Sequence, residues 1–318
     1  MNDSYDVVIV GGGAAGLGGA LSLTRARRSV LVVDSGAPRN ASAGHMHNYL
    51  GREGTNPLDL LRIGRGEIAG YGGEFISGAV VDVRRAGGVF RVVLADGGEV
   101  AARQVLVTSG LVDELPDVPG LRDRWGRDVL HCPYCHGWEV RDRAIGILAT
   151  HPALAAHQAQ MWRQWSADVV VFAHTAPAFA GADLDRLAAR GIEVIDGAVA
   201  GLEVADDRLT AVLVDGRGPV ARDAVVVPPR FTARVDFLAS LGIKPVAQEM
   251  AGEVLGTHLA VDPTGATPVA GVWAAGNVID PRAQVISAAA SGVQTGAMIN
   301  AALIEQDVEA ALDRSRVG

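Results

Sequence analysis

The chain has 318 residues, so at about 150 residues per domain it has room for two domains and a sizeable core. Its 36 acidic and 28 basic residues give a net charge of −8, which excludes the broad basic surface that nucleic-acid binding requires. Hydrophobic residues make up 49% of the chain and charged residues 20%, a balance that excludes a disordered protein. No run approaches the roughly 18 apolar residues of a membrane helix, and the N-terminus lacks a signal-peptide pattern. We therefore expect a cytoplasmic protein with neither nucleic acid nor a membrane as its partner.

The N-terminal segment predicts a strand, a tight turn, a helix and a second strand. An apolar run at residues 5–10 leads into the glycine-rich segment 11–16, and small and apolar residues continue to about Leu23. A second apolar run, residues 30–33, ends at Asp34. This length matches a βαβ unit, which predicts the doubly wound α/β class.

The glycine-rich turn and Asp34 together predict a dinucleotide site. In Gly11-x-Gly13-x-x-Gly16 the first glycine permits a sharp turn, the second lets the backbone approach a pyrophosphate, and the third lets helix and strand pack closely. Asp34 follows Gly11 by 23 residues, where a carboxylate accepts hydrogen bonds from a ribose 2′-hydroxyl. A merely tight turn is the alternative, and the flanking strand and helix disfavour it. A carboxylate at Asp34 also disfavours a 2′-phosphate, so the site suits FAD or NAD over NADP.

Beyond Asp34 the apolar runs predict a second cycle of strands and helices, separated from the first by a linker with prolines at residues 115–120. Strands are predicted at residues 74–83, 89–94, 104–107, 144–148, 169–172, 192–195 and 271–276, the last running into a turn, and helices at 152–165, 183–190 and 283–303. The expected fold is α/β with two Rossmann-like, doubly wound domains. Residues 1–115 and 246–318 are assigned to the first domain, and residues 120–240 to a central domain that carries both cysteines.

Both cysteines stand in the segment HCPYCHG at residues 131–137. In the cytosol such pairs are more often catalytic, redox-sensing or metal-binding than structural. The two residues between Cys132 and Cys135 bring the sulfurs close enough to alternate between dithiol and disulfide, which favours a redox pair. A zinc site is the alternative, but His131 and His136 adjoin the cysteines and do not stand at zinc-ligand spacing, so no metal is expected. His136 is a candidate acid or base, with a plain loop histidine as the alternative.

The other histidines carry weaker signals. His45 and His47 stand in the segment 44–51, where they either face a cofactor or cap a loop. His151, His157 and His174 are spread over the second domain without a matching cluster of carboxylates, which favours solvated or capping roles.

These motifs resemble the low-molecular-weight thioredoxin reductases, a family of FAD-dependent pyridine nucleotide-disulfide oxidoreductases, along nearly the whole chain. Residues 48–51, Asn-Tyr-Leu-Gly, look like the family's flavin-contacting loop, and residues 108–110 resemble its Ala-Thr-Gly strand end. Residues 275–285 resemble the segment that closes over the flavin, with Asn277 where the family usually has Asp. The resemblance implies these FAD contacts: Gly11, Gly13, Ala14, Ala15, Gly16, Asp34, Asn48, Thr108, Gly110, Gly276, Asn277, Gln284 and Val285.

The resemblance also implies roles for the cysteines. Cys135 would lie next to the flavin, Cys132 would meet the substrate, and the protein would be a homodimer. His136 stands where thioredoxin reductases carry an acidic residue, and Cys-Pro-Tyr-Cys-His-Gly is similar to the flavin-dependent dithiol oxidases of the gliotoxin and holomycin type. This similarity implies an oxidase that closes the disulfide of a small-molecule dithiol through the Cys132–Cys135 pair and FAD, with oxygen as the electron acceptor.

The second domain departs from the family at its NADPH site. Thioredoxin reductases hold NADPH with a second glycine-rich turn and a His-Arg-Arg segment, whereas residues 149–156 contain no glycine and residues 173–177 no arginine. Cβ atoms crowd a pyrophosphate, and the lost charged hydrogen bonds remove selectivity, so we expect weak or absent NADPH binding. Two alternatives stay open. One is a reductase of a thioredoxin-like protein, driven by NADPH, ferredoxin or another flavin, and the other is a redox-sensing flavoprotein that regulates a partner.

Overall fold

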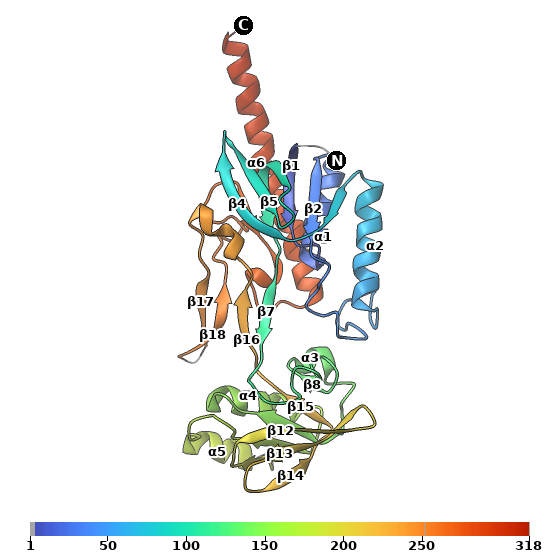
Figure 1. Cartoon of the computed structure of the whole chain (residues 1–318), viewed down its shortest axis with the longest axis vertical. Coiled ribbons are helices and arrows are strands. Elements are labelled where there is room, and N and C mark those ends of the chain that lie inside the picture. Colours follow the sequence, from blue (N-terminus) through green and yellow to red (C-terminus); the bar gives the residue numbers. More distant parts are fainter. Residues whose placement is uncertain (1–3, 251, 318) are drawn as a thin grey trace.

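The computed structural model describes residues 4–250 and 252–317, which form two bodies joined by a pair of strands (Figure 1). We call residues 4–114, 230–250 and 252–317 the outer body, and residues 115–229 the central body. The outer body holds the first and the last described residues, and the central body lies at the other end of the molecule (Figure 1).

A mostly parallel sheet forms the middle of the outer body. In the described part of the chain its strands follow the order β3-β2-β1-β6-β5-β4, and β19 pairs with β6. Their bounds are β1 Ser4–Val10, β2 Val30–Asp34, β3 Glu74–Ser77, β4 Val80–Ala86, β5 Val89–Leu94, β6 Glu99–Val107 and β19 Val272–Ala274. In β19, Val272 lies opposite Val105 of β6 in parallel register, so the C-terminal part of the chain returns to the first sheet.

Helices and a 3-10 segment cover both faces of this sheet, as a parallel sheet requires. The helices of the outer body are α1 (Ala14–Arg25), α2 (Pro57–Gly70) and α6 (Val285–Val317). Its 3-10 segments are η1 (Asp236–Leu241) and η2 (Gly276–Val278). On one face Leu23 of α1 and Leu303 of α6 pack with Ile9 and Val32. Burying each such side chain contributes about 1.5 to 3 kcal/mol, which anchors the helices to the strands. Within the described ranges, no helix is long and apolar enough to cross a membrane.

The central body is built on a second parallel sheet, ordered β11-β10-β9-β15-β8 among the described strands. Its strands are β8 Val129–Leu130, β9 Ile145–Leu148, β10 Val169–Phe172, β11 Glu193–Ile195 and β15 Ala224–Val226. Beside them stand helices α3 (Pro133–His136), α4 (Pro152–Trp162) and α5 (Gly181–Ala188), and an antiparallel sheet of β12 Val199–Ala205, β13 Arg208–Val214 and β14 Gly218–Ala221. Trp162 of α4 is fully buried against Ile145 and Ile147, which fixes α4 on the sheet.

Two strands carry the chain between the bodies and fix the distance between them. Strand β7 (Leu111–Glu114) leads out of the outer body, and β16 (Arg230–Ala233) leads back, antiparallel to it (Figure 1). On the other side β16 pairs with β18 (Glu253–His258), which pairs with β17 (Val246–Met250). The resulting sheet forms one wall of the space between the bodies.

Several predicted elements have different bounds in the structure. The strand predicted at residues 74–83 is two strands, β3 and β4, because the chain changes partners at Gly78 and Ala79. The Gly78 N–H donates to Asp34 at 3.0 Å, and the Ala79 carbonyl accepts from Ala95 at 2.9 Å. Helix α4 ends at Trp162, short of residue 165, and α6 continues to Val317, beyond residue 303. The register between distant strands decides the first of these differences, and local periodicity carries no information about it.

The predicted division into residues 1–115 with 246–318 and residues 120–240 stays a prediction. Leu238 of η1 is fully buried and packs with Val8 and Val105 in the outer body. The chain therefore already contributes to the outer core ahead of residue 240, which the sequence assigned to the central domain.

Candidate functional site: a dinucleotide cavity facing a cysteine pair

A cavity of about 1370 Å³ lies between the two bodies. On the outer side the turn 11–15 and the ends of β2 and β6 line it, and on the central side residues 131–136 do. It therefore opens at the carboxyl ends of parallel strands, where α/β sheets bind their ligands. Its volume exceeds the roughly 300 to 1,000 Å³ of common ligand pockets, which leaves room for a dinucleotide and a second molecule.

The glycine turn at the base of the cavity is held by close backbone contacts. Gly11 has φ +109° and donates its N–H to the Val33 carbonyl at 2.8 Å, a conformation that favours glycine. A Cβ on Gly16 would lie 1.9 Å from the Gly11 carbonyl oxygen, so this position permits no side chain. Thr108 donates from Oγ1 to the Gly11 carbonyl at 2.7 Å and ties the end of β6 to the turn. A Cβ on Gly13, in contrast, would meet no atom within 4 Å, so the structure leaves open space at that point of the cavity wall.

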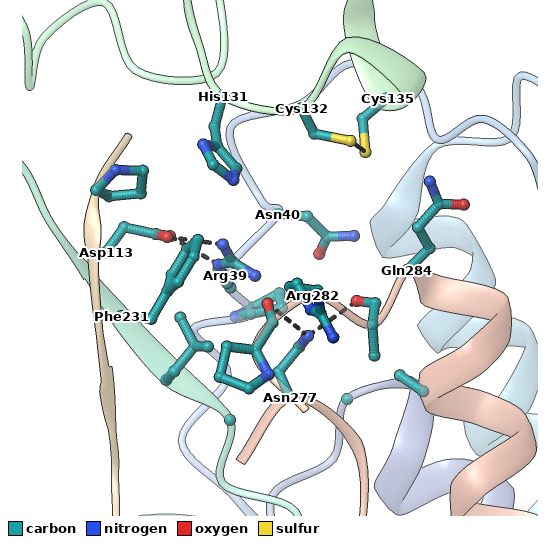
Figure 2. A pocket seen from close by; sticks show the side chains of 18 of the residues that line it. Arg39, Asn40, Asp113, His131, Cys132, Cys135, Phe231, Asn277, Arg282 and Gln284 are labelled. Atoms are coloured by element: carbon teal, nitrogen blue, oxygen red, sulfur yellow. Dashed lines mark hydrogen bonds and ion pairs between the residues drawn. The ribbon is translucent and has the colours of Figure 1, made fainter. Parts of the chain in front are cut away.

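The cysteine pair forms the opposite wall of the cavity. Cys132 immediately precedes α3, and Cys135 lies within it. Both are free and half-buried, and the Cys135 thiol donates to the Cys132 sulfur with the two Sγ atoms 2.6 Å apart. The Cys132 carbonyl accepts from the N–H groups of Cys135 and His136 at 3.1 and 3.2 Å, which closes the turn. Figure 2 shows both sulfurs pointing toward the space that Asn40 and Gln284 also face.

Trp165 packs against the back of residues 132–137, which we call the cysteine turn. Its ring meets Tyr134 edge-on at a centroid distance of 5.5 Å and stands 6.3 Å from the buried Trp162. A Cβ on Gly137 would lie 2.9 Å from the Trp165 ring and 2.4 Å from the Pro133 carbonyl oxygen. The glycine after the second cysteine therefore lets the turn pack directly on the tryptophan, so that the core of the central body fixes the position of the sulfurs.

Hydrogen bonding gives the two thiols unequal pKa values. The Cys135 thiol lowers the pKa of Cys132 to about 7, helped by the backbone N–H groups of Cys135 and Tyr134 and by the charge of Arg39, while burial opposes this shift. The same hydrogen bond and the burial raise the pKa of Cys135, because its proton is shared with the neighbouring sulfur. Cys132 is therefore the member of the pair that ionises near neutral pH while Cys135 keeps its proton, and the thiolate is the reactive form.

A cluster formed by Arg39, Asp113, Phe231 and His131 lies beside the cysteine pair in the same cavity (Figure 2). Arg39 donates two hydrogen bonds of 2.7 Å to the Asp113 carboxylate, and its guanidinium lies over the Phe231 ring, 5.1 Å from the centroid. Phe231 and Asp113 face each other across the β16–β7 pair, and Phe231 also packs edge-on against His131 at 5.3 Å. Burial, and then the charge of Arg39, lower the pKa of His131 to about 4, so that this imidazole is neutral at pH 7. The cluster thus brings one fixed cation to the cavity.

Removing this cation is expected to raise the pH at which Cys132 becomes reactive. In the reduced protein, iodoacetamide should alkylate Cys132 with a midpoint near its pKa of about 7, because only the thiolate reacts. In Arg39→Gln the thiolate loses a stabilising positive charge, so the midpoint should move to higher pH, and Arg39→Lys should move it less. The measurement is the alkylation rate against pH, with the modified cysteine identified by mass spectrometry. Arg230→Gln, an exposed arginine beside Phe231, is the control, and an unchanged midpoint in Arg39→Gln would contradict the assignment.

The loop before α6 completes the cavity. The Asn277 amide donates to the carbonyls of Ala283 at 2.8 Å and Asp280 at 3.1 Å, and thereby folds the loop that presents Arg282 and Gln284 (Figure 2). A carboxylate cannot donate these hydrogen bonds. An asparagine at position 277, where the family that the sequence resembles usually has Asp, therefore has a structural consequence, since its amide ties the loop together through these two hydrogen bonds.

The structure brings most of the predicted site residues to one cavity. Those that line it are Gly11, Gly13, Ala14, Ala15, Asp34, Thr108, Gly110, Cys132, Cys135, His136, Asn277, Gln284 and Val285. Gly16, Asn48 and Gly276 lie outside the lining. The Asn48 side chain donates to the Tyr134 carbonyl at 2.6 Å, and thus joins its loop to the cysteine turn. Asp34 accepts a hydrogen bond on Oδ2 from Arg65 of α2.

Sequence reasoning missed Arg39, Asp113, Phe231 and Arg282. Arg39 stands five residues after Asp34, in Pro-Arg-Asn, and Arg282 lies within the segment 275–285, in Pro-Arg-Ala-Gln. Their position close after a strand end or before a helix was the available signal. Asp113 and Phe231 had none, because they meet through the pairing of two strands more than a hundred residues apart.

The comparisons with known proteins agree with this geometry. A family model described as pyridine nucleotide-disulphide oxidoreductase matches residues 5–296. The chain belongs to this family. The oxidoreductase is 30% identical to thioredoxin reductase sirT from Leptosphaeria maculans over 96% of both chains. It is 37% identical to thioredoxin reductase aclD from Aspergillus oryzae, over 46% of this chain and about half, 48%, of that protein. The crystal structure of HlmI is 46% identical, with a TM-score of 0.92 over 99% of this chain and 98% of that one.

The oxidoreductase is thus a thioredoxin reductase-like enzyme that acts on sulfur groups, and its family implies FAD. The cavity fits this cofactor. The turn around Gly13 leaves open space for a pyrophosphate at the start of α1, where backbone N–H groups and the helix dipole favour phosphate. Asp34 would hold a ribose, and Gln284 with the start of α6 would lie along the flavin end near Cys135. Among the described residues, no group of three or more His, Cys, Asp or Glu side chains is placed to hold a metal.

A side chain at Gly13 is expected to weaken FAD binding without disturbing the fold. Because a Cβ there meets no protein atom, Gly13→Ala should leave the melting temperature of the apoprotein unchanged. The same Cβ would crowd the pyrophosphate at a cost of about 1 to 3 kcal/mol, or about five- to 150-fold in FAD affinity. Gly16→Ala is the matched contrast, since its Cβ clashes with the Gly11 carbonyl and should lower the apoprotein's melting temperature. Fluorescence titration with FAD checks the first variant, and parental affinity in Gly13→Ala would contradict this FAD placement.

Proposed function

We propose that the oxidoreductase oxidises a small dithiol to its disulfide, with FAD passing the electrons to oxygen. The observation that carries this proposal is the contrast between the two bodies. The outer body presents a dinucleotide cavity to the Cys132–Cys135 pair, whereas the central body presents no comparable phosphate turn. The segment Cys-Pro-Tyr-Cys-His-Gly, similar to the dithiol oxidases, supports the same direction of reaction.

Side chains occupy the position in the central body where a second nucleotide would bind. His151 precedes α4 and Pro152 begins it, so no glycine turn faces the helix start. The Glu253 carboxylate lies 3.6 Å from the His151 ring, and a negative charge near a helix start disfavours phosphate. After β10, His174 accepts a hydrogen bond of 3.0 Å from the Val199 N–H and is thereby tied to β12. These contacts support our proposal that NADPH is not the electron donor.

The chain's own residues would carry out the thiol–disulfide exchange. In the oxidised enzyme a substrate thiol gives its proton to His136 and its sulfur bonds to Cys132, while the Cys132–Cys135 bond breaks and Cys135 leaves. The second substrate thiol then displaces Cys132 and closes the substrate disulfide. The substrate loses two electrons and two protons, and the cysteine pair becomes a dithiol. Bound FAD supplies the remaining chemistry, since it takes the electron pair from this dithiol and reduces oxygen to hydrogen peroxide.

The recessed position of the pair favours a small dithiol over a protein. Both cysteines are half-buried and line the cavity, so a substrate must enter the space between the bodies. The experiment that tests the proposed function is reduction of the bound flavin without oxygen, by a small dithiol and separately by NADPH. We expect the dithiol alone to reduce it.

A further inference from the structure

A second, smaller cavity of about 140 Å³ adjoins the cysteine turn on the side of the loop 44–53. We call it the side cavity. His136 lines both this side cavity and the main one, as do His45 and His47. Glu139 lines the side cavity as well. An imidazole with the redox cavity on one side and an ionisable pocket on the other is placed to pass protons between them.

His47 connects this pocket to solvent through two carboxylates. Its Nδ1 lies 2.6 Å from Glu53 Oε1, and its Nε2 lies 3.4 Å from Glu139 Oε1. The side chains of Glu53 and Glu139 are 65% and 43% exposed, whereas His47 is 22% exposed. The hydrogen bond from His47 and one from the Asn48 N–H lower the pKa of Glu53, which keeps it ionised and makes it release any proton that it receives to water. The two ring nitrogens of His47 therefore each face a carboxylate that water can reach.

The proposed reaction needs a path for protons to solvent, because its proton transfers take place inside the cavity between the two bodies. When a substrate thiol attacks Cys132, one S–H bond breaks, one S–S bond forms, and the Cys132–Cys135 bond breaks. The proton released in this step must leave His136 before the imidazole can accept another. Burial lowers the pKa of His136, so the protonated ring holds its proton weakly and releases it readily.

We propose that His47, with Glu53 and Glu139, is the proton-exchange site of His136, and that it carries the substrate's proton to solvent. The inference rests on the proposed function for the origin of the proton, while the path rests on the side cavity that His136 shares with His47 and Glu139 and on the contacts of His47 with Glu53 and Glu139. His136 releases the proton to His47, either directly or through Glu139. His47 Nδ1 then delivers a proton to Glu53, which passes it to water. Returning protons follow the same path when oxygen is reduced. His47 is a positioning and relay residue in this account, since it acts through His136.

The charges that face His47 are compatible with this role. Besides Glu53 and Glu139, the groups around the side cavity are His45, His136 and Arg127. The His45 and His47 ring centroids lie 6.5 Å apart, and no carboxylate contacts His45 in the part of the chain that the structure describes. Arg127 is engaged by Asp207. His45 thus shares the loop and both cavities with His47 but lacks its carboxylate partners, which makes it a matched control.

The experiment compares the parent, His47→Gln, Glu53→Gln and His45→Gln by two readouts. The first is the rate at which the labelled His136 imidazole exchanges its N–H proton with water, measured by NMR on the holoenzyme. The second is the pH profile of turnover with dithiothreitol under air, in water and in heavy water. In His47→Gln we expect slower exchange at His136, a fall in turnover at pH 7 of about ten- to a hundredfold, and a larger solvent isotope effect. Added imidazole should restore turnover in His47→Ala, and His45→Gln should keep the parental pH profile.

Two outcomes would overturn the proposal. One is parental exchange at His136 in His47→Gln, and the other is a loss of turnover with an unchanged isotope effect and no rescue by imidazole, which indicates a merely structural role. If the parent itself does not turn over dithiothreitol but exchange at His136 depends on His47, the proposed function fails while the proton path stands.

Discussion

Serine in place of Cys135 is expected to abolish the oxidation of small dithiols while the flavin stays bound. The turnover of dithiothreitol should fall by at least about a thousandfold, because the electron pair has no route from the substrate to FAD without both sulfurs. Cys132→Ser should be equally inactive, since the proposed exchange begins with attack of the substrate thiol on the Cys132 sulfur of the disulfide. Oxygen consumption measures the loss, and the visible flavin spectrum shows that the cofactor is retained.

The control for both variants lies just beyond the same turn. Trp138 is exposed and stacks on Arg141 outside the cavity, so Trp138→Phe should keep the parental rate. Substantial turnover in either serine variant would show that the dithiol reduces the flavin directly, and the proposed exchange at Cys132 would be wrong. Inactivity in Trp138→Phe would mean that small changes near the turn disturb activity in general.

The parts of the site that local rules govern could be predicted from the sequence. The glycine turn is one of them, because a sharp turn and a close helix approach each demand glycine within a few residues, and Gly11 and Gly16 show these contacts. The pairing of Cys132 with Cys135 is another, since two intervening residues in one helical turn suffice to bring the sulfurs together.

The parts that depend on distant pairing could not be predicted. Arg39 meets Asp113 and Phe231 only because β7 and β16 pair in one particular register. Asn48 is a second residue whose contacts depend on distant parts of the chain. Its assignment to the flavin stays a prediction from the resemblance, and the sequence did not indicate that its side chain donates to the Tyr134 carbonyl of the central body. A loop residue's partner depends on how the two bodies sit together, and a single sequence does not contain that arrangement.

NADPH is expected to be a poor reductant of the flavin even though the central body has a nucleotide-domain fold. The fold alone supplies strands and helix positions, while affinity for a dinucleotide phosphate comes from a glycine turn and cationic side chains. Loss of two charged hydrogen bonds, at about 1.5 to 3 kcal/mol each, lowers affinity by about 10² to 10⁴-fold. In addition, the His151 side chain would crowd a phosphate at the start of α4, and the Glu253 carboxylate beside it would repel the phosphate's negative charge. We therefore expect reduction by NADPH to be orders of magnitude slower than reduction by a dithiol.

The most direct test of this account is made without oxygen on the FAD-loaded protein. NADPH is added to one sample and dithiothreitol to another, and bleaching of the visible flavin band is followed in both before oxygen is admitted. We predict rapid bleaching by the dithiol alone, and recovery of the band with release of hydrogen peroxide once oxygen enters. Rapid bleaching by NADPH would contradict the account, because the enzyme would then be a reductase whose central body binds the nucleotide without glycines or arginines.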